Sequence, residues 1–324
     1  MRINDRIYGE FEIAESVLIE IINSKTLQRL KGISQMGMPD EYYHKKGFSR
    51  YEHCVGVMLL LRKLGASLPE QIAGLLHDVS HTAFSHLIDW VIGDPTKENY
   101  QDDNFKNFID KSDIPKILNK YGFDVDDICN LDKFSLLENE APNICADRVD
   151  YSLREIVNFE SKDKFKLILE SLIDYQGTIT FNSIKAAEIF AFDFARCQKE
   201  HWAGLPAKAR YHILASALKI ALHKKIITEK DFWKTDQEVL KLLIDSKDVE
   251  VLKFLEMLKL GFVIKSSTDK SGILLRKKFR YVDPFVLTSN GLFKVSELSS
   301  NYKKSLELQK NESNELNYFE VVAK

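Results

Sequence analysis

The stretch SLPEQIAGLLHDVSHTAFSHLID, residues 67–89, joins the pattern of a buried helix to a row of ionisable side chains. Ser67 and Glu70 have the spacing of a capping box, which marks the start of a helix. Apolar residues then recur at three- and four-residue spacings and form one stripe, namely Ile72, Leu75, Leu76 and Val79. We therefore expect a helix here whose apolar stripe packs against a core.

The same stretch carries five groups that can bind a metal, namely His77, Asp78, His81, His86 and Asp89. Because His77 and His81 are one helical turn apart, their imidazoles project from nearly the same side. Buried polar groups need partners, and a divalent ion binds imidazole and carboxylate together. A single helical histidine, however, is more often an ordinary surface or core residue. The spacing alone leaves metal binding and a structural role equally open.

The rest of the chain predicts a mainly α protein. Most of residues 14–260 have helical periodicity, and only the polar, acidic segment 93–115 has the composition of a loop leading into a short helix. From Gly261 onward, short β-branched and aromatic segments separated by turn residues predict a small sheet, with FEVVA as its last strand. We expect an all-helical core over residues 1–205 and a C-terminal helical plus small β-sheet region over 206–324.

The composition is that of an ordinary globular protein, with 44% hydrophobic and 29% charged residues in a chain of 324. The 46 basic and 48 acidic residues nearly balance, which makes a nucleic-acid partner unlikely. The four cysteines are scattered without CxxC spacing, so they predict neither a zinc ribbon nor a disulfide framework. The longest apolar run, Val55–Leu61, is too short to cross a bilayer. We expect a cytoplasmic protein without a membrane partner.

Three stretches of the chain form an ordered set of motifs. Read together, SRYEHCVGV, LLHDVSHTAFSH and ADRVDYSLRE resemble the H…HD…D signature of the HD phosphohydrolase superfamily. The closer likeness is to the branch that contains the deoxynucleoside triphosphate triphosphohydrolases. The flanking segments LQRLKGISQMG, KARYHILASALKIAL and RKKFRYVDP agree with this, so the resemblance covers nearly the whole chain.

The resemblance implies one divalent metal ion, which could be Mn, Fe, Mg, Zn or Ni. Carried over by motif, its ligands would be His53, His77, Asp78 and Asp147. Such an ion can position a water molecule and polarise a phosphoryl group. His81 resembles the family histidine beside the reacting phosphate, where it would donate to phosphate oxygens or transfer a proton. Asp89 would then be the acidic partner of His81.

The resemblance also implies a substrate pocket. Gln35 would contact the sugar, and Arg50 and Arg148 would pair with phosphates through their forked donors. Tyr151 and Glu155 would line the sugar and phosphate pocket. Positions 147, 148, 151 and 155 are spaced to share one helical face. Without the resemblance, the same stripe would be interpreted as a solvated helix face with an intrahelical ion pair.

The chain departs from the family pattern at one position. Members of this branch usually carry a second catalytic histidine, followed by glutamate, in the segment after FSHxxD. Here that segment is TKENYQDDNF, in which Lys97–Glu98 or Gln101–Asp102 takes its place. Neither lysine nor glutamine exchanges protons near neutral pH as an imidazole does. The chemistry therefore runs on His81, Asp89 and the metal, or turnover is weak.

Two further segments have alternative interpretations. The basic patch of Arg276, Lys277, Lys278 and Arg280 is either a charged sheet face or a site for phosphate or a regulatory nucleotide. The segment EHWAGLPAKARYH holds His201, Trp202, Arg210 and His212, which could reach an active-site mouth. We interpret this segment as a helix junction.

The leading hypothesis is hydrolysis of a (deoxy)nucleoside triphosphate to a nucleoside and inorganic triphosphate. One alternative is an HD phosphohydrolase acting on nucleoside monophosphates, cyclic nucleotides or other phosphoesters. Another is a nucleotide-binding sensor with weakened catalysis, which the missing histidine motivates. The resemblance also implies a homo-oligomer, a dimer or larger.

Overall fold

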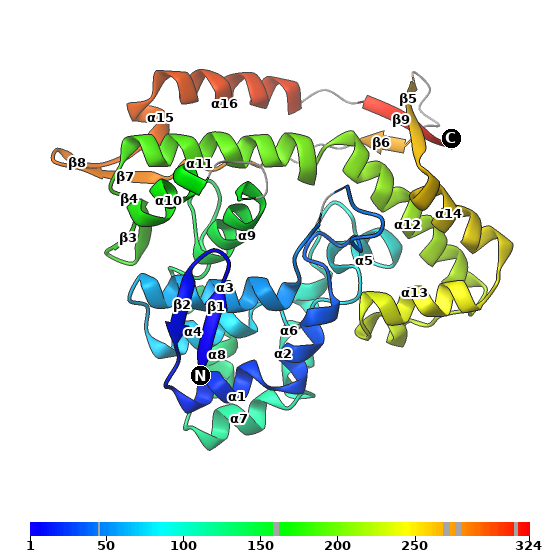
Figure 1. The fold of residues 1–324 in the computed structure, drawn as a ribbon, viewed down its shortest axis with the longest axis horizontal. Coiled ribbons are helices and arrows are strands. Elements are labelled where there is room, and N and C mark those ends of the chain that lie inside the picture. The colour runs from blue at the N-terminus through cyan, green and yellow to red at the C-terminus, as the bar shows by residue number, and fades with distance from the viewer. Residues whose placement is uncertain (45, 158–161, 268–272, 276–279, 314–316) are drawn as a thin grey trace.

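The computed structural model describes the whole chain except residues 45, 158–161, 268–272, 276–279 and 314–316. The described residues are mainly helical, as predicted, and their strands form small sheets at the periphery (Figure 1). Among these residues, no helix combines the length and apolarity needed to span a bilayer.

The helices of the first half are α1 (Ser16–Ile22), α2 (Lys25–Arg29), α3 (Arg50–Lys63), α4 (Leu68–Leu76), α5 (Ile88–Val91), α6 (Tyr100–Asp110), α7 (Ile114–Lys120), α8 (Val125–Cys129) and α9 (Ala146–Ile156). Those of the second half are α10 (Lys162–Ser171), α11 (Ile184–Cys197), α12 (Leu205–His223), α13 (Asp236–Asp245), α14 (Val249–Leu260), α15 (Val295–Leu298) and α16 (Ser300–Ser313). Short 3₁₀ turns are η1 (Leu30–Gly32), η2 (Ser85–Leu87), η3 (Leu131–Lys133) and η5 (Glu229–Trp233). A π-helical turn, η4 (Gln198–Trp202), links α11 to α12.

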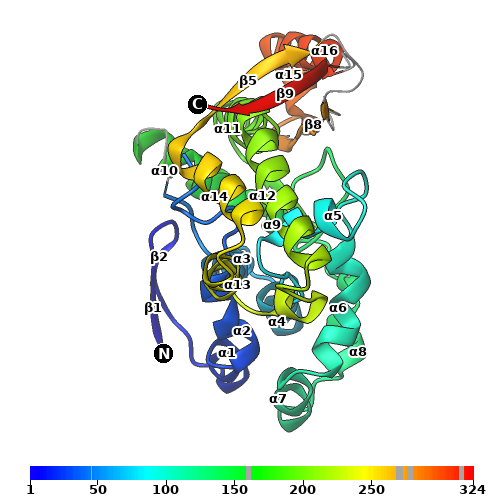
Figure 2. The same cartoon turned by 90° about the vertical axis from the view of Figure 1, so that its right-hand side faces the viewer.

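The strands pair in three groups within the described residues. An N-terminal hairpin joins β1 (Arg2–Asp5) to β2 (Gly9–Glu12). A second sheet has the order β3 (Leu172–Tyr175), β4 (Thr178–Phe181), β7 (Phe285–Thr288) and β8 (Gly291–Lys294). A third has the order β5 (Phe262–Ser267), β9 (Asn317–Ala323) and β6 (Ile273–Leu275), so the expected strand FEVVA is part of β9. Figure 2 shows this third sheet at the end of the molecule opposite α7.

The hairpin of β3 and β4 lies where helical periodicity was expected, so that part of the prediction was wrong. The two strands are joined by Gln176 and Gly177, which both have positive φ, at 55° and 78°. Two consecutive residues of this kind form the tight turn whose twist suits a hairpin. The alternating pattern of LIDYQGTITF and its glycine were the signals that could have identified it.

The start of α4 agrees with the capping prediction only in part. The Ser67 side chain accepts the backbone N–H of Glu70, as an N-cap residue should. The Glu70 carboxylate does not return to residue 67 but accepts the backbone N–H groups of Leu136 and Leu137, at 2.9 and 3.1 Å. Two loop donors that would otherwise be buried without a partner are thereby satisfied. Glu70 thus fixes the loop that precedes α9.

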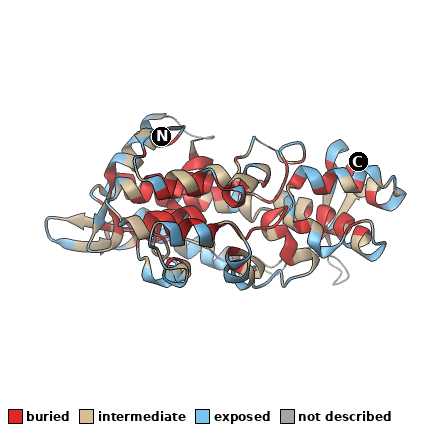
Figure 3. Ribbon diagram, turned by 90° about the horizontal axis from the view of Figure 1, so that it is seen from below, coloured by how far each residue is buried: buried red, intermediate tan, exposed pale blue. Residues whose placement is uncertain are grey.

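Helix α3 runs through the core and carries part of the site. Its residues from His53 to Leu61 are buried on every face, against α4 on one side and α9 on another. Figure 3 shows buried residues along the middle of the molecule, with exposed ones at its margins. Because the helix is enclosed, any ionisable side chain on it needs a partner inside the protein.

Two apolar clusters divide the core, and they do not follow the chain in order. The first surrounds α3, α4, α9 and α11 and also includes Val286 and Tyr302 from near the C-terminus. The second surrounds α12, α13 and α14 and includes Phe84 and Leu87. Helix α12 begins at Leu205, next to the expected boundary between residues 1–205 and 206–324. Strand β4 of the first region, however, pairs in parallel with β7 of the second, so one sheet joins the two regions.

The first turn of α3 is held by a capping box between Ser49 and Glu52, in which each side chain accepts the other's backbone N–H. We predict that Ser49→Ala lowers the free energy of unfolding by about 1 kcal/mol, because an orphan helix N–H loses its partner. Urea denaturation measures this. Lys63→Ala, at the exposed end of the same helix, is the control and should stay within about 0.5 kcal/mol of the parent. Equal stabilities for the two variants would contradict the role of the cap.

Candidate active site

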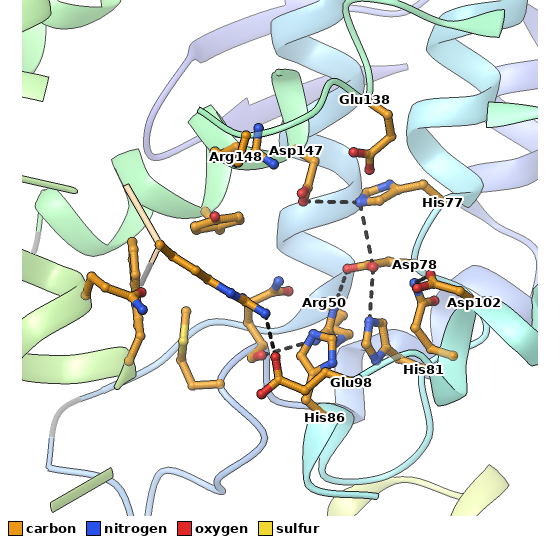
Figure 4. Close-up of a pocket in the computed structure, with 18 of the residues that line it drawn as sticks. Arg50, His77, Asp78, His81, His86, Glu98, Asp102, Glu138, Asp147 and Arg148 are labelled. Atoms are coloured by element: carbon orange, nitrogen blue, oxygen red, sulfur yellow. Dashed lines mark hydrogen bonds and ion pairs between the residues drawn. The ribbon is translucent and has the colours of Figure 1, made fainter. Parts of the chain in front are cut away.

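A cavity of about 950 Å³ opens beside the ends of α3 and α4. Its walls come from the loop before α3, the end of α4, α6, the loop before α9, and the η4–α12 junction. Acidic and imidazole groups gather on one side, and Figure 4 shows them pointing toward one another across a short span. Segments far apart in the sequence therefore meet at one polar floor.

Two histidines at this floor have fixed tautomers. His53, in the first turn of α3, is fully buried, and its Nδ1 donates to Asp150 Oδ2 at 2.7 Å. His77 follows α4, and its Nδ1 donates to the carbonyl oxygen of Gly74 at 2.8 Å. Because a carboxylate and a carbonyl can only accept, the Nδ1 atoms hold the protons. The two Nε2 atoms then face each other with their lone pairs, 3.3 Å apart.

Carboxylates complete the group around these nitrogens. Asp147 Oδ1 lies 2.9 Å from His53 Nε2 and 3.6 Å from His77 Nε2. One donor atom from each of these three residues lies within 4.8 Å of the others, a group compatible with a divalent metal. Asp78 stands beside them, with its oxygens 3.6 Å from His53 Nε2 and 3.8 Å from His77 Nε2. The residues expected as metal ligands are thus brought together.

The electrostatics of the floor favour a positive charge. Burial alone would lower the pKa of His77, but the carboxylates of Asp78 and Asp147 raise it to about 10. The pKa of His53 is raised in the same way, against burial, by Asp147 and Asp150. The pKa of Asp147 is lowered by the two imidazoles in spite of its burial. Nitrogen and oxygen donors that hold extra protons so strongly also suit a divalent cation, and the donor set therefore fits a metal.

His81 and Asp89, expected to act as a pair, have different partners. His81 Nε2 lies 3.2 Å from Asp78 Oδ1. Asp89 lies 4.0 Å from His86 Nδ1, and it accepts the backbone N–H of Tyr100 at 3.1 Å. The expected pairing of Asp89 with His81 is therefore replaced by one with Asp78. Burial, together with the charge of Arg50, lowers the pKa of His81 to about 4, so its imidazole is neutral at neutral pH.

His86 is the residue that the sequence reasoning noted without giving it a role. Its ring lies edge-on to the ring of His81, with the centroids 4.8 Å apart. Its side chain is 41% exposed and lines the cavity. Four residues lie between the two histidines, so a continuous helix would direct them to different faces. Helix α4 ends at Leu76, however, and Phe84 and Ser85 in the loop that follows have φ values of 63° and 50°, so helical spacing does not reveal that the two rings are close.

The segment without the family histidine also reaches the cavity. Glu98, Gln101 and Asp102 line it. Gln101 is held by Ser80, whose hydroxyl donates to its side-chain oxygen at 2.7 Å. Burial and the nearby Asp78 carboxylate raise the pKa of Asp102. This wall therefore contributes two carboxylates and one amide to the cavity. In place of the histidine that this segment lacks, His86 puts a second imidazole beside His81.

The residues expected to contact phosphate differ in how accessible they are. Arg50 is 2% exposed, and its guanidinium binds Asp78, the Ser85 hydroxyl and the carbonyl of Gln35. It is thus built into the wall behind the floor. Arg148 lines the cavity. Its Nη1 donates hydrogen bonds to the backbone carbonyls of Asn139 and Asn143 and to the thiol of Cys145. Its remaining N–H groups make it the better placed phosphate donor of the two.

Of the residues expected near the sugar, Gln35 and Tyr151 line the cavity and Glu155 does not. The Gln35 side chain is nearly buried, lines the cavity, and has an oxygen without a hydrogen-bond partner. Tyr151 lines the cavity with its ring edge-on to Trp202, 5.3 Å between centroids. Glu155, expected in the same wall, is 2% exposed and lies outside the cavity lining. One further turn of α9 carries it behind Tyr151.

The helix junction reaches the cavity as well. His201, Trp202 and Arg210 line its wall, so the segment forms both a junction and part of the mouth. Arg280 enters from the C-terminal region and forms an ion pair with Glu98. The other members of the basic patch, Arg276, Lys277 and Lys278, lie outside the described residues.

Comparisons with known proteins agree with this geometry. The family model described as "HD domain" matches residues 50–133. The chain is 39% identical over 94% of its length to the uncharacterized protein YdhJ of Bacillus subtilis, of which 94% is covered. It is 40% identical over 48% of its length to the metal-dependent phosphohydrolase cns2 of Cordyceps militaris, of which 45% is covered.

A third relative has a named substrate class. The chain is 32% identical, over 39% of its length, to the human deoxynucleoside triphosphate triphosphohydrolase SAMHD1, of which the alignment covers 24%. The matched HD domain contains the His77–Asp78 doublet, whose side chains lie beside His53 and Asp147 at the cavity floor. The chain therefore belongs to the HD-domain superfamily of metal-dependent phosphohydrolases.

Proposed function

We propose that the protein hydrolyses (deoxy)nucleoside triphosphates to a nucleoside and inorganic triphosphate, with one divalent ion held by His53, His77, Asp78 and Asp147. The observation that carries this proposal is the convergence of two imidazole lone pairs, 3.3 Å apart, with carboxylate oxygens at the floor of a nucleotide-sized cavity. The name of the human relative, which covers only part of this chain, supports the choice of substrate.

The metal, when bound, would polarise the phosphoryl group and lower the pKa of a water ligand. The side chains beside it supply the proton transfers. His81 is kept neutral by burial and is oriented by Asp78, so it can accept a proton or a hydrogen bond. His86 lines the cavity beside His81, and burial together with the neighbouring His81 and Arg50 lowers its pKa, so its neutral imidazole can accept a proton or a hydrogen bond there. His81 and His86 would thus take the proton-transfer roles that the resemblance assigns to His81 and to the absent second histidine.

The remaining walls fit a nucleotide. Gln35 offers an unpaired buried acceptor, which a sugar hydroxyl would satisfy. Arg148 offers several donors for phosphate oxygens, in the planar fork that suits them. Tyr151 and Trp202 supply aromatic surface for the flat parts of the ligand. A cytoplasmic location and assembly into a dimer or larger homo-oligomer remain predictions.

Removing the doublet should remove the metal. We predict that the double variant His77→Ala/Asp78→Ala, purified in parallel with the parent, retains no bound divalent metal, because half of the donor groups are lost. Elemental analysis gives the metal content per chain, and circular dichroism checks that the helical fold persists. His223→Ala, at an exposed histidine of α12, is the matched control. A metal content unchanged in the double variant would exclude this site.

The phosphate product identifies the bond that is cleaved. With each of the four deoxynucleoside triphosphates, we predict release of inorganic triphosphate and the free nucleoside, separable by ion chromatography. Orthophosphate or pyrophosphate would instead place the attack at another phosphorus. Activity on nucleoside monophosphates or cyclic nucleotides alone would favour the alternative phosphohydrolase. Binding without any product, across several metals, would favour a nucleotide sensor.

The role of His86 can be separated from that of the metal. We predict that His86→Gln lowers kcat about 100- to 10,000-fold while the metal content stays at the parent level, because a proton-transfer group is lost. Steady-state kinetics with elemental analysis measures both. His212→Gln, on α12 outside the cavity lining, should behave like the parent. A parental kcat for His86→Gln would remove this residue from the mechanism.

A further inference from the structure

A buried polar network lies behind His53, on the side away from the metal donors. Asp150, on α9, accepts both the Nδ1–H of His53 at 2.7 Å and the Nε–H of Arg154 at 2.8 Å, through the same oxygen, Oδ2. All three side chains are fully buried. A carboxylate on the far nitrogen of a metal-binding histidine fixes the ring and its tautomer and makes the ligating nitrogen more basic.

The network continues to the N-terminal hairpin. Arg154 Nη2 donates to Asp5 Oδ2 at 2.8 Å. Asp5 also accepts the backbone N–H groups of Ile7 and Tyr8 through its other oxygen. Asp5, at the end of strand β1, is therefore linked to His53 at the cavity floor through Arg154 and Asp150 of α9.

Helix α3 makes room for this network at Gly56. A Cβ on Gly56 would lie 2.0 Å from Arg154 Nη2 and 2.1 Å from Asp150 Oδ1. Any larger residue would therefore push the ion pair away from α3, which also carries His53 one turn earlier. The absence of a side chain at this position allows α9 to approach closely enough for Asp150 to reach the imidazole.

The ion pair is not arranged for stability alone. Arg154 Nη1 is buried without a hydrogen-bond partner among the residues that the structure describes. Charged groups buried with unmet hydrogen bonds cost free energy, and well-packed apolar residues are often as stable or more so. What the carboxylate does provide is a strong acceptor aimed at one nitrogen of His53. This acceptor orients the His53 ring at the proposed metal site, and it is not needed for packing.

We propose that Asp150 is a positioning residue for the metal: it takes the Nδ1–H of His53 and directs the Nε2 lone pair at the ion, while Arg154 and Asp5 hold the carboxylate in place. This inference rests on the proposed metal site at His53. The opposing view is that Asp150 serves only to neutralise Arg154, in which case its loss would alter stability but not metal binding.

Two variants separate these views. Arg154→Met removes the guanidinium and keeps the carboxylate on His53. Asp150→Leu/Arg154→Met replaces the whole ion pair by apolar side chains of similar shape, so the fold should persist. Urea denaturation of both verifies folding. Affinity for Co²⁺, measured by competition with a chelator, should be about ten- to a hundredfold weaker in the double variant and much closer to the parent in Arg154→Met.

A spectroscopic signal reports on the hydrogen bond itself. In the cobalt-loaded protein, the ring N–H protons of the two ligating histidines should give strongly shifted proton resonances that disappear in D₂O. One of the two should move or broaden in the double variant, because the Nδ1–H of His53 loses its acceptor. The other, from His77, keeps the Gly74 carbonyl and should remain. Asp150→Asn in the Arg154→Met background, which restores an acceptor without the charge, should recover part of the Co²⁺ affinity.

The outcomes distinguish this inference from the proposed function. If the parent protein binds no Co²⁺, the proposed metal site itself is wrong. If the parent binds Co²⁺ and the folded double variant binds it equally well, with both N–H resonances in place, the metal site stands and Asp150 is not a positioning residue. Weaker binding in the double variant, with one N–H resonance altered, supports the role.

Discussion

The site depends on two imidazole lone pairs that are aimed at the same place. The Nε2 atoms of His53 and His77 lie 3.3 Å apart, and in the neutral tautomer that each Nδ1 partner imposes both carry a lone pair. Two acceptors at that distance, with Asp147 Oδ1 against both, repel one another unless a positive charge lies among them. In the absence of a metal, extra protons meet this need, which is why the pKa of each imidazole is raised. The arrangement is therefore compatible with a divalent cation among these donors.

This constraint explains features of the fold that packing alone would not require. Helix α3 is enclosed, yet its first turn carries Arg50 and His53, both with their polar groups directed at other helices. The capping box at Ser49 fixes where that turn begins. Gly56 lets α9 approach, and the turn after α4 presents Asp78 to the same floor. Since the proposed ligands come from three segments, namely α3, the turn after α4 and α9, a small shift of any one of them would separate the donors.

The sequence predicted the parts of this site that local spacing determines, and it missed those that depend on backbone reversals. The one-turn spacing predicted His77 and His81 on one side of a helix, but α4 ends at Leu76 and the two residues lie in the turns that follow, where both side chains still lie beside Asp78. His53 and Asp147 could be added only through the resemblance, because no local pattern connects residues so far apart in the chain. The pairing of Asp89 with His81 was wrong and the position of His86 was missed for one reason: the helix on which the spacing argument relied ends at Leu76, and the loop after it reverses through the positive φ values of Phe84 and Ser85. The hairpin of β3 and β4 was also missed, because the positive φ values of Gln176 and Gly177 reverse the chain in a segment where only weak helical periodicity was considered.

The charge of the cavity also bears on how a polyanionic substrate would bind. Besides the proposed ligands, Glu138 and Asp102 line the floor, and burial beside Asp147 raises the pKa of Glu138 to about 7. A polyanionic substrate would meet like charges there, at short range and in a partly buried setting where repulsion is only weakly screened. A divalent ion reverses the sign of that interaction, while Arg148 in the adjacent wall favours phosphate whether or not the ion is present. Under the proposed function, the cation would replace the extra protons held by His53 and His77 and would supply the positive charge that a polyanionic substrate needs beside these carboxylates.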